Sequence, residues 1–283
     1  MRYHYTESNT GADFRLSLEE PEFNRRYFQE KEDQLLAIAW NRGEDQNAYI
    51  DEVEMHFPNN SFISLTAQQT FEFQRSEDVV IWQYNREFYC ILDHDKEVSC
   101  VGFLFYGGHG TMLIQPNAAE ARKFGLLLEV FKDEFQTRDN IQGEMLRMLL
   151  KRLIIKLTRL GKAQHLNTAI SENDFDLLRK FNVLVEGHFK QYHQVQDYAN
   201  LLHKSPKTLS NLFHKNQEKS PLQIIQERIA LEGKRLLVYT DLSASEIGYE
   251  LGFEEPAHFS RFFKKMTGHS PTKFKQELKK SLA

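Results

Sequence analysis

The strongest constraint on this chain is a repeat with a period of fifty residues near its C-terminus. Residues 205–215, SPKTLSNLFHK, recur as residues 255–265, EPAHFSRFFKK, and Ser220-Pro221 recur as Ser270-Pro271. Upstream of these segments, the second copy has one extra residue between its two apolar stretches. Because a turn tolerates so short an insertion, each copy is expected to be two short helices joined by a turn.

Helix start and stop signals support this interpretation. In the second copy, Ser243 and Glu246 have the spacing of a capping box, which predicts a helix over 243–251. Gly252 suits the left-handed conformation after a helix, and Pro256 suits the first turn of the next one. A helix capped by Ser220-Pro221 and running from Leu222 to Tyr239 is expected to connect the copies. At ~18 residues it would span ~27 Å, which is similar to the ~34 Å of one duplex turn.

The second helix of each copy is predicted to have one buried and one polar face. Apolar residues at 3-4 spacing form the buried stripes: Leu209, Leu212 and Phe213, then Phe259, Phe262, Phe263 and Met266. The other faces are polar, mostly basic and rich in hydrogen-bond donors: Lys207, Ser210, Asn211, His214 and Lys215, then Ala257, His258, Ser260, Arg261, Lys264 and Lys265. This is the helix-turn-helix pattern, in which the second helix enters the DNA major groove.

The charge distribution divides the chain in the same way. The formal net charge of the 283 residues is −4. Residues 1–187 carry 21 Lys and Arg against 30 Asp and Glu, whereas residues 188–283 carry 15 against 10. An acidic body of net charge −9 is therefore followed by a basic domain of net charge +5, as expected when only the C-terminal part binds nucleic acid.

Composition excludes several other classes of protein. Glycine and proline together account for 21 residues, too few for a disordered or collagen-like chain. Two cysteines, Cys90 and Cys100, cannot form a disulfide framework. The N-terminal residues lack the apolar core of a signal peptide, and no apolar run approaches the ~18 residues that a membrane span needs. We therefore expect a cytoplasmic protein without a membrane partner.

Four segments of the C-terminal part resemble the signature of AraC/XylS-type transcriptional regulators. They are 228–237 (RIALEGKRLL), 241–253 (DLSASEIGYELGF), 258–265 (HFSRFFKK) and 268–271 (GHSP). The resemblance covers residues 171–278 and implies a leading helix at 171–188. Gly233 and Gly248 stand where the family usually has alanine, which should loosen these helices by up to ~1 kcal/mol each.

The resemblance also implies which side chains contact DNA. Base edges would be faced by Lys207, Ser210 and Asn211 in the first copy and by Ala257, Ser260 and Arg261 in the second. Lys215, Lys264 and Lys265 would lie nearer the phosphates. Side-chain chemistry independently favours Arg261 as a partner of guanine and Asn211 as a partner of adenine. For His258, a DNA contact and a partly buried position on the helix are equally plausible.

The N-terminal body is expected to consist of strands up to about residue 115. Aromatic and β-branched segments at 62–66, 79–84, 87–92 and 101–106 predict a sandwich or barrel, and the resemblance suggests a cupin-like one. The fold class is thus α+β. The proposed walls of an effector pocket are Trp82, Tyr84, Phe103 and Phe105, with a packed core as the alternative. No metal, cofactor or catalytic set is predicted, because His56, His94 and His109 are isolated in the sequence.

Two amphipathic helices are predicted after the strands, at 118–135 and 141–160. In the second, leucines follow heptad spacing at Leu146, Leu150, Leu153, Leu157 and Leu160. This seam fits a dimer helix or packing against the strands, and the resemblance favours the dimer. Residues 161–170 are predicted to be an interdomain linker.

These observations predict a DNA-binding transcriptional regulator, an activator or a repressor, with three segments. Residues 1–160 would sense a small-molecule effector and dimerise, 161–170 would link, and 171–283 would bind promoter DNA. RNA polymerase is a further candidate partner. Two alternatives stay open: a cupin-type enzyme or metabolite-binding protein with a helical scaffold, and a helical module that docks on another protein.

Overall fold

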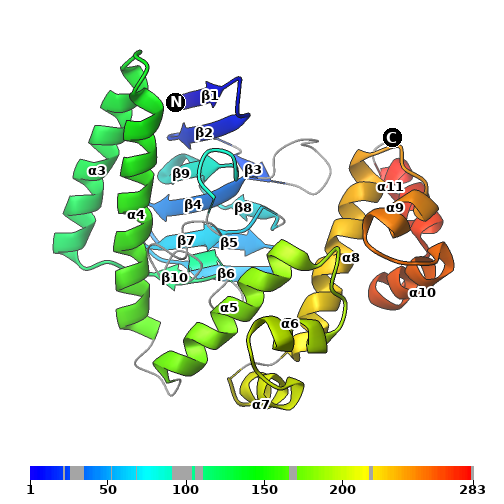
Figure 1. The fold of residues 1–283 in the computed structure, drawn as a ribbon. Helices are drawn as coiled ribbons and strands as arrows, with labels where there is room; N and C mark the ends of the chain where they lie inside the picture. Colours follow the sequence, from blue (N-terminus) through cyan, green and yellow to red (C-terminus); the bar gives the residue numbers. More distant parts are fainter. Residues whose placement is uncertain are drawn as a thin grey trace. The chain divides into compact units, whose positions relative to one another are not determined.

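The chain forms two compact units, Met1–Ser171 and Glu172–Ala283, in a computed structural model (Figure 1). It describes residues 1–21, 23–25, 35–51, 53–67, 69–90, 104–105, 111–165, 171–216 and 219–281. The first unit contains strands followed by two helices, and the described residues of the second are helices and their connections. The predicted α+β class is confirmed.

Two antiparallel sheets make up the strand part of the first unit. The larger sheet has the order β1 (Arg2–Glu7), β2 (Ala12–Ser17), β9 (Val79–Tyr84), β4 (Leu36–Asn41), β7 (Phe62–Leu65) and β10 (Leu113–Ile114). The smaller sheet has the order β3 (Asn24–Arg25), β8 (Phe71–Phe73), β5 (Gln46–Ile50) and β6 (Val53–Phe57). A short 3-10 helix, η1 (Ser76–Asp78), precedes β9.

The larger sheet is the middle layer of this unit because both of its faces are covered. On one face, Ala39, Ile63 and Ile81 join Phe57 and Phe71 of the smaller sheet in a buried apolar cluster. The other face packs against α3 (Ala118–Gln136) and α4 (Gln142–His165). Aromatic rings fill that second interface: Trp82 and Phe14 each lie 5.9 Å from Phe131, and Phe62 lies 4.7 Å from Phe124, between ring centroids.

Helices α3 and α4 run antiparallel, side by side (Figure 1). Asn117 caps α3, since its side chain accepts hydrogen bonds from the backbone amides of Ala119 and Glu120. Lys156 of α4 pairs with Glu120 at 2.7 Å near the start of α3. These contacts, together with the rings beneath, fix α3 and α4 as one layer on the sheet.

The heptad leucines of α4 lie inside the protomer, which corrects their prediction as a dimer seam. Leu146, Leu150, Leu153 and Leu157 are at most 1% exposed, and Leu160 is half-buried. They face the sheet and α3, so a second chain could reach them only by unpacking this core. The heptad spacing here reflects packing within one chain, which was the alternative interpretation.

Two other local predictions are wrong. Residues 87–90 form a turn and irregular backbone instead of a strand, and Leu104 and Phe105 are helical; 91–103 and 106 lie outside the described residues. The aromatic residues serve packing: the ring of Phe88 stacks on Phe14 at 4.6 Å and lies beneath the guanidinium of Arg147. The predicted linker is helical over 161–165, because α4 extends to His165; 166–170 lie outside the described residues.

The proposed pocket walls are core residues where the structure describes them. Trp82 is 1% exposed and Tyr84 is fully buried, both on the face of β9 that packs against the helices. Phe105 lies edge-on to Tyr84 at 6.3 Å between ring centroids, while Phe103 lies outside the described residues. Trp82 and Tyr84 are thus buried as expected of a packed core, which was the alternative to their role as pocket walls.

The second unit contains the helices α5 (Glu172–His188), α6 (Val195–Leu201), α7 (Pro206–Asn216), α8 (Pro221–Tyr239), α9 (Ala244–Glu250), α10 (Pro256–Thr267) and α11 (Pro271–Ser281). A single buried apolar cluster takes residues from α5 to α10, including Phe181, Phe213, Ile229 and Phe259. In Figure 1, α6 and α7 lie toward the N-terminal end of α8, and α9 to α11 lie toward its C-terminal end.

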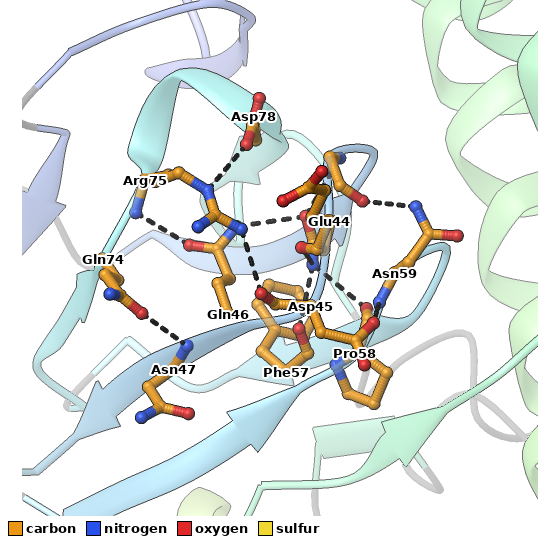
Figure 2. A network of polar contacts seen from close by, with 12 residues as sticks. Glu44, Asp45, Gln46, Asn47, Phe57, Pro58, Asn59, Gln74, Arg75 and Asp78 are labelled. Carbon is orange, nitrogen blue, oxygen red and sulfur yellow. Dashed lines mark hydrogen bonds and ion pairs between the residues drawn. The ribbon is translucent and has the colours of Figure 1, made fainter.

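A buried polar network closes one end of the strand sandwich (Figure 2). Its centre is Asn41, whose side-chain nitrogen donates to the carbonyls of Glu44, Phe57 and Pro58 at 2.9 to 3.1 Å. The Asn41 side-chain oxygen accepts from the buried amide of Gln46 at 3.0 Å. The network thus joins the ends of β4, β5 and β6 through one fully buried side chain.

We predict that Asn41→Ala lowers the free energy of unfolding of the first unit by about 2 to 4 kcal/mol, because it leaves buried carbonyls and the Gln46 amide without partners. Chemical denaturation followed by tryptophan fluorescence measures the change, since Trp40 adjoins Asn41. The control is Asn140→Ala, at an exposed asparagine between α3 and α4. Equal stability of the two variants would contradict a structural role for the network.

Candidate nucleic-acid interface

The two helix pairs α6–α7 and α9–α10 have the same turn geometry. A residue in the left-handed conformation follows each first helix: His203 with φ 52° and Gly252 with φ 80°. In each turn the next amide bonds back to the first helix at 2.9 Å, from Lys204 to Ala199 and from Phe253 to Gly248. The second turn is one residue longer, as predicted from the repeat.

Gly252 is required in the second turn for two reasons. Its φ is one that residues with a Cβ adopt only at a cost. In addition, a Cβ at this position would lie 2.0 Å from the carbonyl oxygen of Lys190, so the backbone of the α5–α6 connection leaves no room for one. His193 of the same connection hydrogen-bonds the carbonyl of Leu251 at 2.8 Å, which holds the turn in place.

Helix caps lie where the sequence predicted them. Ser243 and Glu246 form the capping box of α9, and Ser220 and Gln223 form one at α8. The hydrogen bonds between Ser243 and Glu246 lower the pKa of the Glu246 carboxyl. Ser205 begins α7 by accepting from the amide of Thr208 at 3.0 Å. The start of each helix is therefore set by local hydrogen bonds.

Phe259 fixes the position of α10 against two neighbouring helices. The side chain is fully buried. A Cβ at Gly248 of α9 would lie 3.1 Å from the Cβ of Phe259, and one at Gly233 of α8 would lie 3.2 Å from its ring. The two glycines thus allow α8 and α9 to approach Phe259 closely, a packing role that their low helix propensity does not reveal.

The polar faces of α7 and α10 carry the residues predicted to contact DNA. Exposed positions are Lys207, Ser210, Asn211, His214 and Lys215 on α7, and Ala257, His258, Arg261, Lys264 and Lys265 on α10, while Ser260 is half-buried. Each helix therefore presents its donors on the side opposite its buried stripe of Leu209 and Phe213 or Phe259 and Phe263.

Most of the cations on these faces are not engaged within the protein. Of the residues that the structure describes, no carboxylate lies within 4.0 Å of Lys207, Arg261, Lys264 or Lys265. Arg261 only bonds back to the carbonyl of Ala257 at 3.3 Å, and Lys215 lies 3.9 Å from Asp174. Their donors are thus available to an anionic ligand.

A buried ion-pair cluster between α5 and α8, which sequence reasoning did not identify, lies in the interior of the second unit. Arg228 pairs with Glu186 at 2.9 Å and with Glu232 at 3.2 Å, and Arg235 pairs with Glu232 at 2.6 Å. Burial alone would raise the pKa of the Glu232 carboxyl, but the hydrogen bond from Arg235 and the charge of Arg228 outweigh it and lower the pKa. These arginines therefore serve the fold.

The described part of the chain offers neither a metal site nor a membrane span. No group of three or more His, Cys, Asp or Glu side chains there could hold a metal ion. None of the helices described combines the length and the apolar character needed to cross a membrane.

Part of the second unit is similar to a helix-turn-helix family, and the chain is similar to transcriptional regulators. Residues 198–277 match the family model described as a helix-turn-helix domain. The uncharacterized HTH-type transcriptional regulator YdiP of Escherichia coli K12 is 21% identical over 257 residues, which is 86% of this chain and 84% of YdiP. The arabinose operon regulatory protein of the same strain is 37% identical over 71 residues, 25% of this chain and 24% of that protein.

Two solved structures are also similar to this chain, with TM-scores below 0.5. ToxT from Vibrio cholerae strain SCE256, solved with an unsaturated fatty acid bound, is 15% identical with a TM-score of 0.45, covering 93% of this chain and 94% of ToxT. The DNA-binding domain of AdpA in complex with a target DNA is 25% identical with a TM-score of 0.32, covering 36% of this chain and 90% of that domain.

We predict that Gly252→Ala destabilises the second unit by well over the ~1 to 2 kcal/mol of a left-handed alanine, because its Cβ would also meet the Lys190 carbonyl. Gly268→Ala is the matched control: Gly268 has φ 81°, and a Cβ there meets nothing within 4 Å. Thermal and urea unfolding of both variants measure the difference. A Gly252→Ala variant no less stable than Gly268→Ala would disprove the close approach to Lys190.

Proposed function

We propose, from the premise that residues 198–277 are an AraC/XylS-type helix-turn-helix domain, that this protein is a sequence-specific DNA-binding transcriptional regulator. The observation that carries the proposal is the pair of exposed, donor-rich faces on α7 and α10. Four of their cations, Lys207, Arg261, Lys264 and Lys265, lack carboxylate partners among the described residues. Two such helices on one chain can contact two adjacent segments of duplex.

The length of α8 supports contact with successive major grooves. Its 19 residues correspond to ~28 Å at 1.5 Å per residue. With its flanking turns, this is close to the ~34 Å that separates successive major grooves on one side of duplex DNA. In this proposal α7 and α10 each enter one groove, and their shared packing against α8 sets the spacing.

Side-chain chemistry assigns different roles to the residues on the two faces. Arg261 can donate two hydrogen bonds to guanine, and Asn211 can pair with adenine, so these two residues would read bases together with Lys207, Ser210, Ala257 and Ser260. Lys215, Lys264 and Lys265 lie one turn further along their helices and would contact phosphates as point charges. His258 is exposed and not buried, which favours its DNA-facing interpretation.

We predict that Arg261→Ala weakens binding to the cognate site by ~1 to 3 kcal/mol and relaxes one base preference. Lys264→Ala should weaken binding to all sequences alike and reduce the salt slope of log K by about one. Fluorescence anisotropy with cognate and scrambled duplexes at several salt concentrations measures both effects.

The control for these variants is Lys180→Ala, an exposed lysine of α5 that is already paired with Asp176 at 2.7 Å. It removes one positive charge without altering either proposed recognition helix. Equal losses on cognate and scrambled DNA for Arg261→Ala would reject the base contact. If Lys180→Ala weakens DNA binding as much as Lys264→Ala does, the effect of Lys264→Ala reflects only the change in net charge and not a phosphate contact.

A homodimer is part of the proposal, formed through the outer surface of α3 and α4. That surface exposes Leu126 (69%) and Val130 on α3 and Met145 and Met148 (66%) on α4. Because α3 and α4 are antiparallel and in contact, these four side chains lie at similar heights on the face turned away from the sheet. Exposed apolar patches of this kind commonly mark protein interfaces, and a dimer would double the number of DNA contacts.

We predict that the double substitution L126E/M148E converts the dimer to a monomer without unfolding the chain, since both side chains are exposed. Sedimentation equilibrium gives the mass, and circular dichroism verifies the fold. Leu222→Glu, at an exposed leucine of α8 in the other unit, is the control and should leave the mass unchanged. Dimers that persist in L126E/M148E would show that another surface mediates association.

Control by a small-molecule effector bound to the first unit is also proposed. The resemblance of the C-terminal part to effector-controlled regulators supports it. So does the presence of a cleft in the first unit, which is distinct from the predicted aromatic pocket.

A further inference from the structure

A cleft of about 770 Å³ lies between the two sheets of the first unit. One wall comes from β1, β2 and β9 of the larger sheet, and the other comes from β3, β8 and the residues next to them. The volume falls in the range of ~300 to 1,000 Å³ that is typical of small-molecule sites. Most of its lining side chains are polar, with Phe23 and Phe73 as the aromatic exceptions.

Strand register explains why this wall of the cleft is polar. Successive side chains of a strand point to opposite faces, so Trp82 and Tyr84 face the helices while Ile81 and Gln83 face the smaller sheet. Ile81 belongs to the apolar cluster between the sheets. Gln83 lies one step further, opposite Arg15 of β2, where the apolar cluster has ended. The interior of the sandwich thus changes from apolar to polar toward β1 and β2.

Two of these polar side chains are buried without hydrogen bonds. Gln83 is 5% exposed and Ser17 is 4% exposed. The Gln83 amide and the Ser17 hydroxyl form no hydrogen bond with any residue that the structure describes. The polar atoms of both side chains remain accessible from the cleft that they line and are not sealed in the core. Their hydrogen-bonding groups are therefore available to a molecule bound in the cleft.

Arg2 adds a positive charge beside them. It lies directly opposite Ser17 in the register of β1 and β2, and Ser17 is the diagonal neighbour of Gln83 across β2 and β9. The Nε of Arg2 pairs with Glu20 at 3.0 Å, while its two terminal nitrogens donate to none of the described residues. Donors of three side chains on adjacent strands therefore converge on one face of the cleft.

We infer that this cleft binds a small hydrophilic molecule with an anionic oxygen group, a carboxylate or a phosphate, held by Arg2, Ser17 and Gln83. A charged oxygen accepts hydrogen bonds from guanidinium, amide and hydroxyl donors, and such charge-assisted bonds are about twice as strong as neutral ones. The carboxylate of Glu77, on the opposite wall, is exposed and would face the polar remainder of the ligand. A long alkyl chain does not fit this lining.

The test measures binding to the full-length protein by isothermal titration calorimetry with a defined set of probes. Citrate and L-glutamate supply carboxylates, glucose 6-phosphate and inorganic phosphate supply phosphates, glucose is the uncharged polar probe, and decanoate is the amphiphilic one. The expected result is binding of a carboxylate or a phosphate, one per chain, at millimolar affinity or better. Binding of a carboxylate probe or of a phosphate probe then shows which of the two anionic groups the cleft recognises.

Two variants assign the binding to this cleft. Gln83→Leu and Arg2→Gln should each weaken the anion by about tenfold or more, the effect of losing a hydrogen bond to a charged group. Arg138→Gln, at an exposed arginine after α3, is the charge-matched control and should bind like the unmodified protein. Without ligand, Gln83→Leu should be as stable as the unmodified protein or more so, because it loses no hydrogen bond. A structural Gln83 would instead make the variant less stable.

The inference is overturned if none of citrate, L-glutamate, glucose 6-phosphate and inorganic phosphate binds, whether or not glucose or decanoate does. It is also overturned if both variants bind the anion as tightly as the control. It rests on the proposed function only in assigning the ligand the role of effector. DNA binding is therefore measured separately on the same preparations without probes. If the protein binds DNA but no anion, the inference of an anion site in the cleft is rejected. If it binds an anion but no DNA, the proposed function as a DNA-binding regulator is rejected.

Discussion

The close packing of Phe259 against two glycines determines the geometry of the proposed DNA-binding surface. A Cβ at Gly233 would crowd its ring and one at Gly248 would crowd its Cβ, so alanine at either position would require Phe259 or its neighbours to shift slightly. Phe259 and Arg261 are two residues apart and therefore lie on different sides of α10. Burial of the phenylalanine is thus what turns Arg261 outward, and the same relation holds between Leu209 and Asn211 on α7.

The two helix pairs are similar in backbone but differ in chemistry. A hydroxyl from Ser205 caps α7, whereas Glu255 precedes α10 without a side-chain cap. The second copy also has two carboxylates, Glu254 and Glu255, before its cations, and the first copy has Lys204 at the corresponding turn. Since carboxylates repel phosphates, the proposed DNA contacts of α10 would depend more on directed hydrogen bonds from Arg261, and those of α7 more on charge. In the proposed function the two faces would suit different DNA segments.

The sequence predicted local features well and long-range packing poorly. The repeat, the caps at Ser220 and Ser243, and the turn glycine depend on neighbours within a few residues, and the structure has them all. The roles of Trp82, Leu150 and Phe88 depend on distant segments. Heptad spacing makes a stripe for any apolar partner, and strand alternation cannot show which face helices will cover. The same ambiguity kept Gln83, next to Trp82, from being identified.

Strand β1 extends from the cleft to the layer of α3 and α4 and contacts α4. At one end, Arg2 faces the cleft, and at the other, Glu7 pairs with Arg147 of α4 at 3.1 Å. Arg147 also donates to the carbonyl of Phe88, so it binds the strand, the turn after β9 and the helix together. In the proposed function, the Glu7–Arg147 ion pair is the contact by which β1 and its Arg2 reach α4, the helix whose outer face carries Met145 and Met148 of the proposed dimer surface.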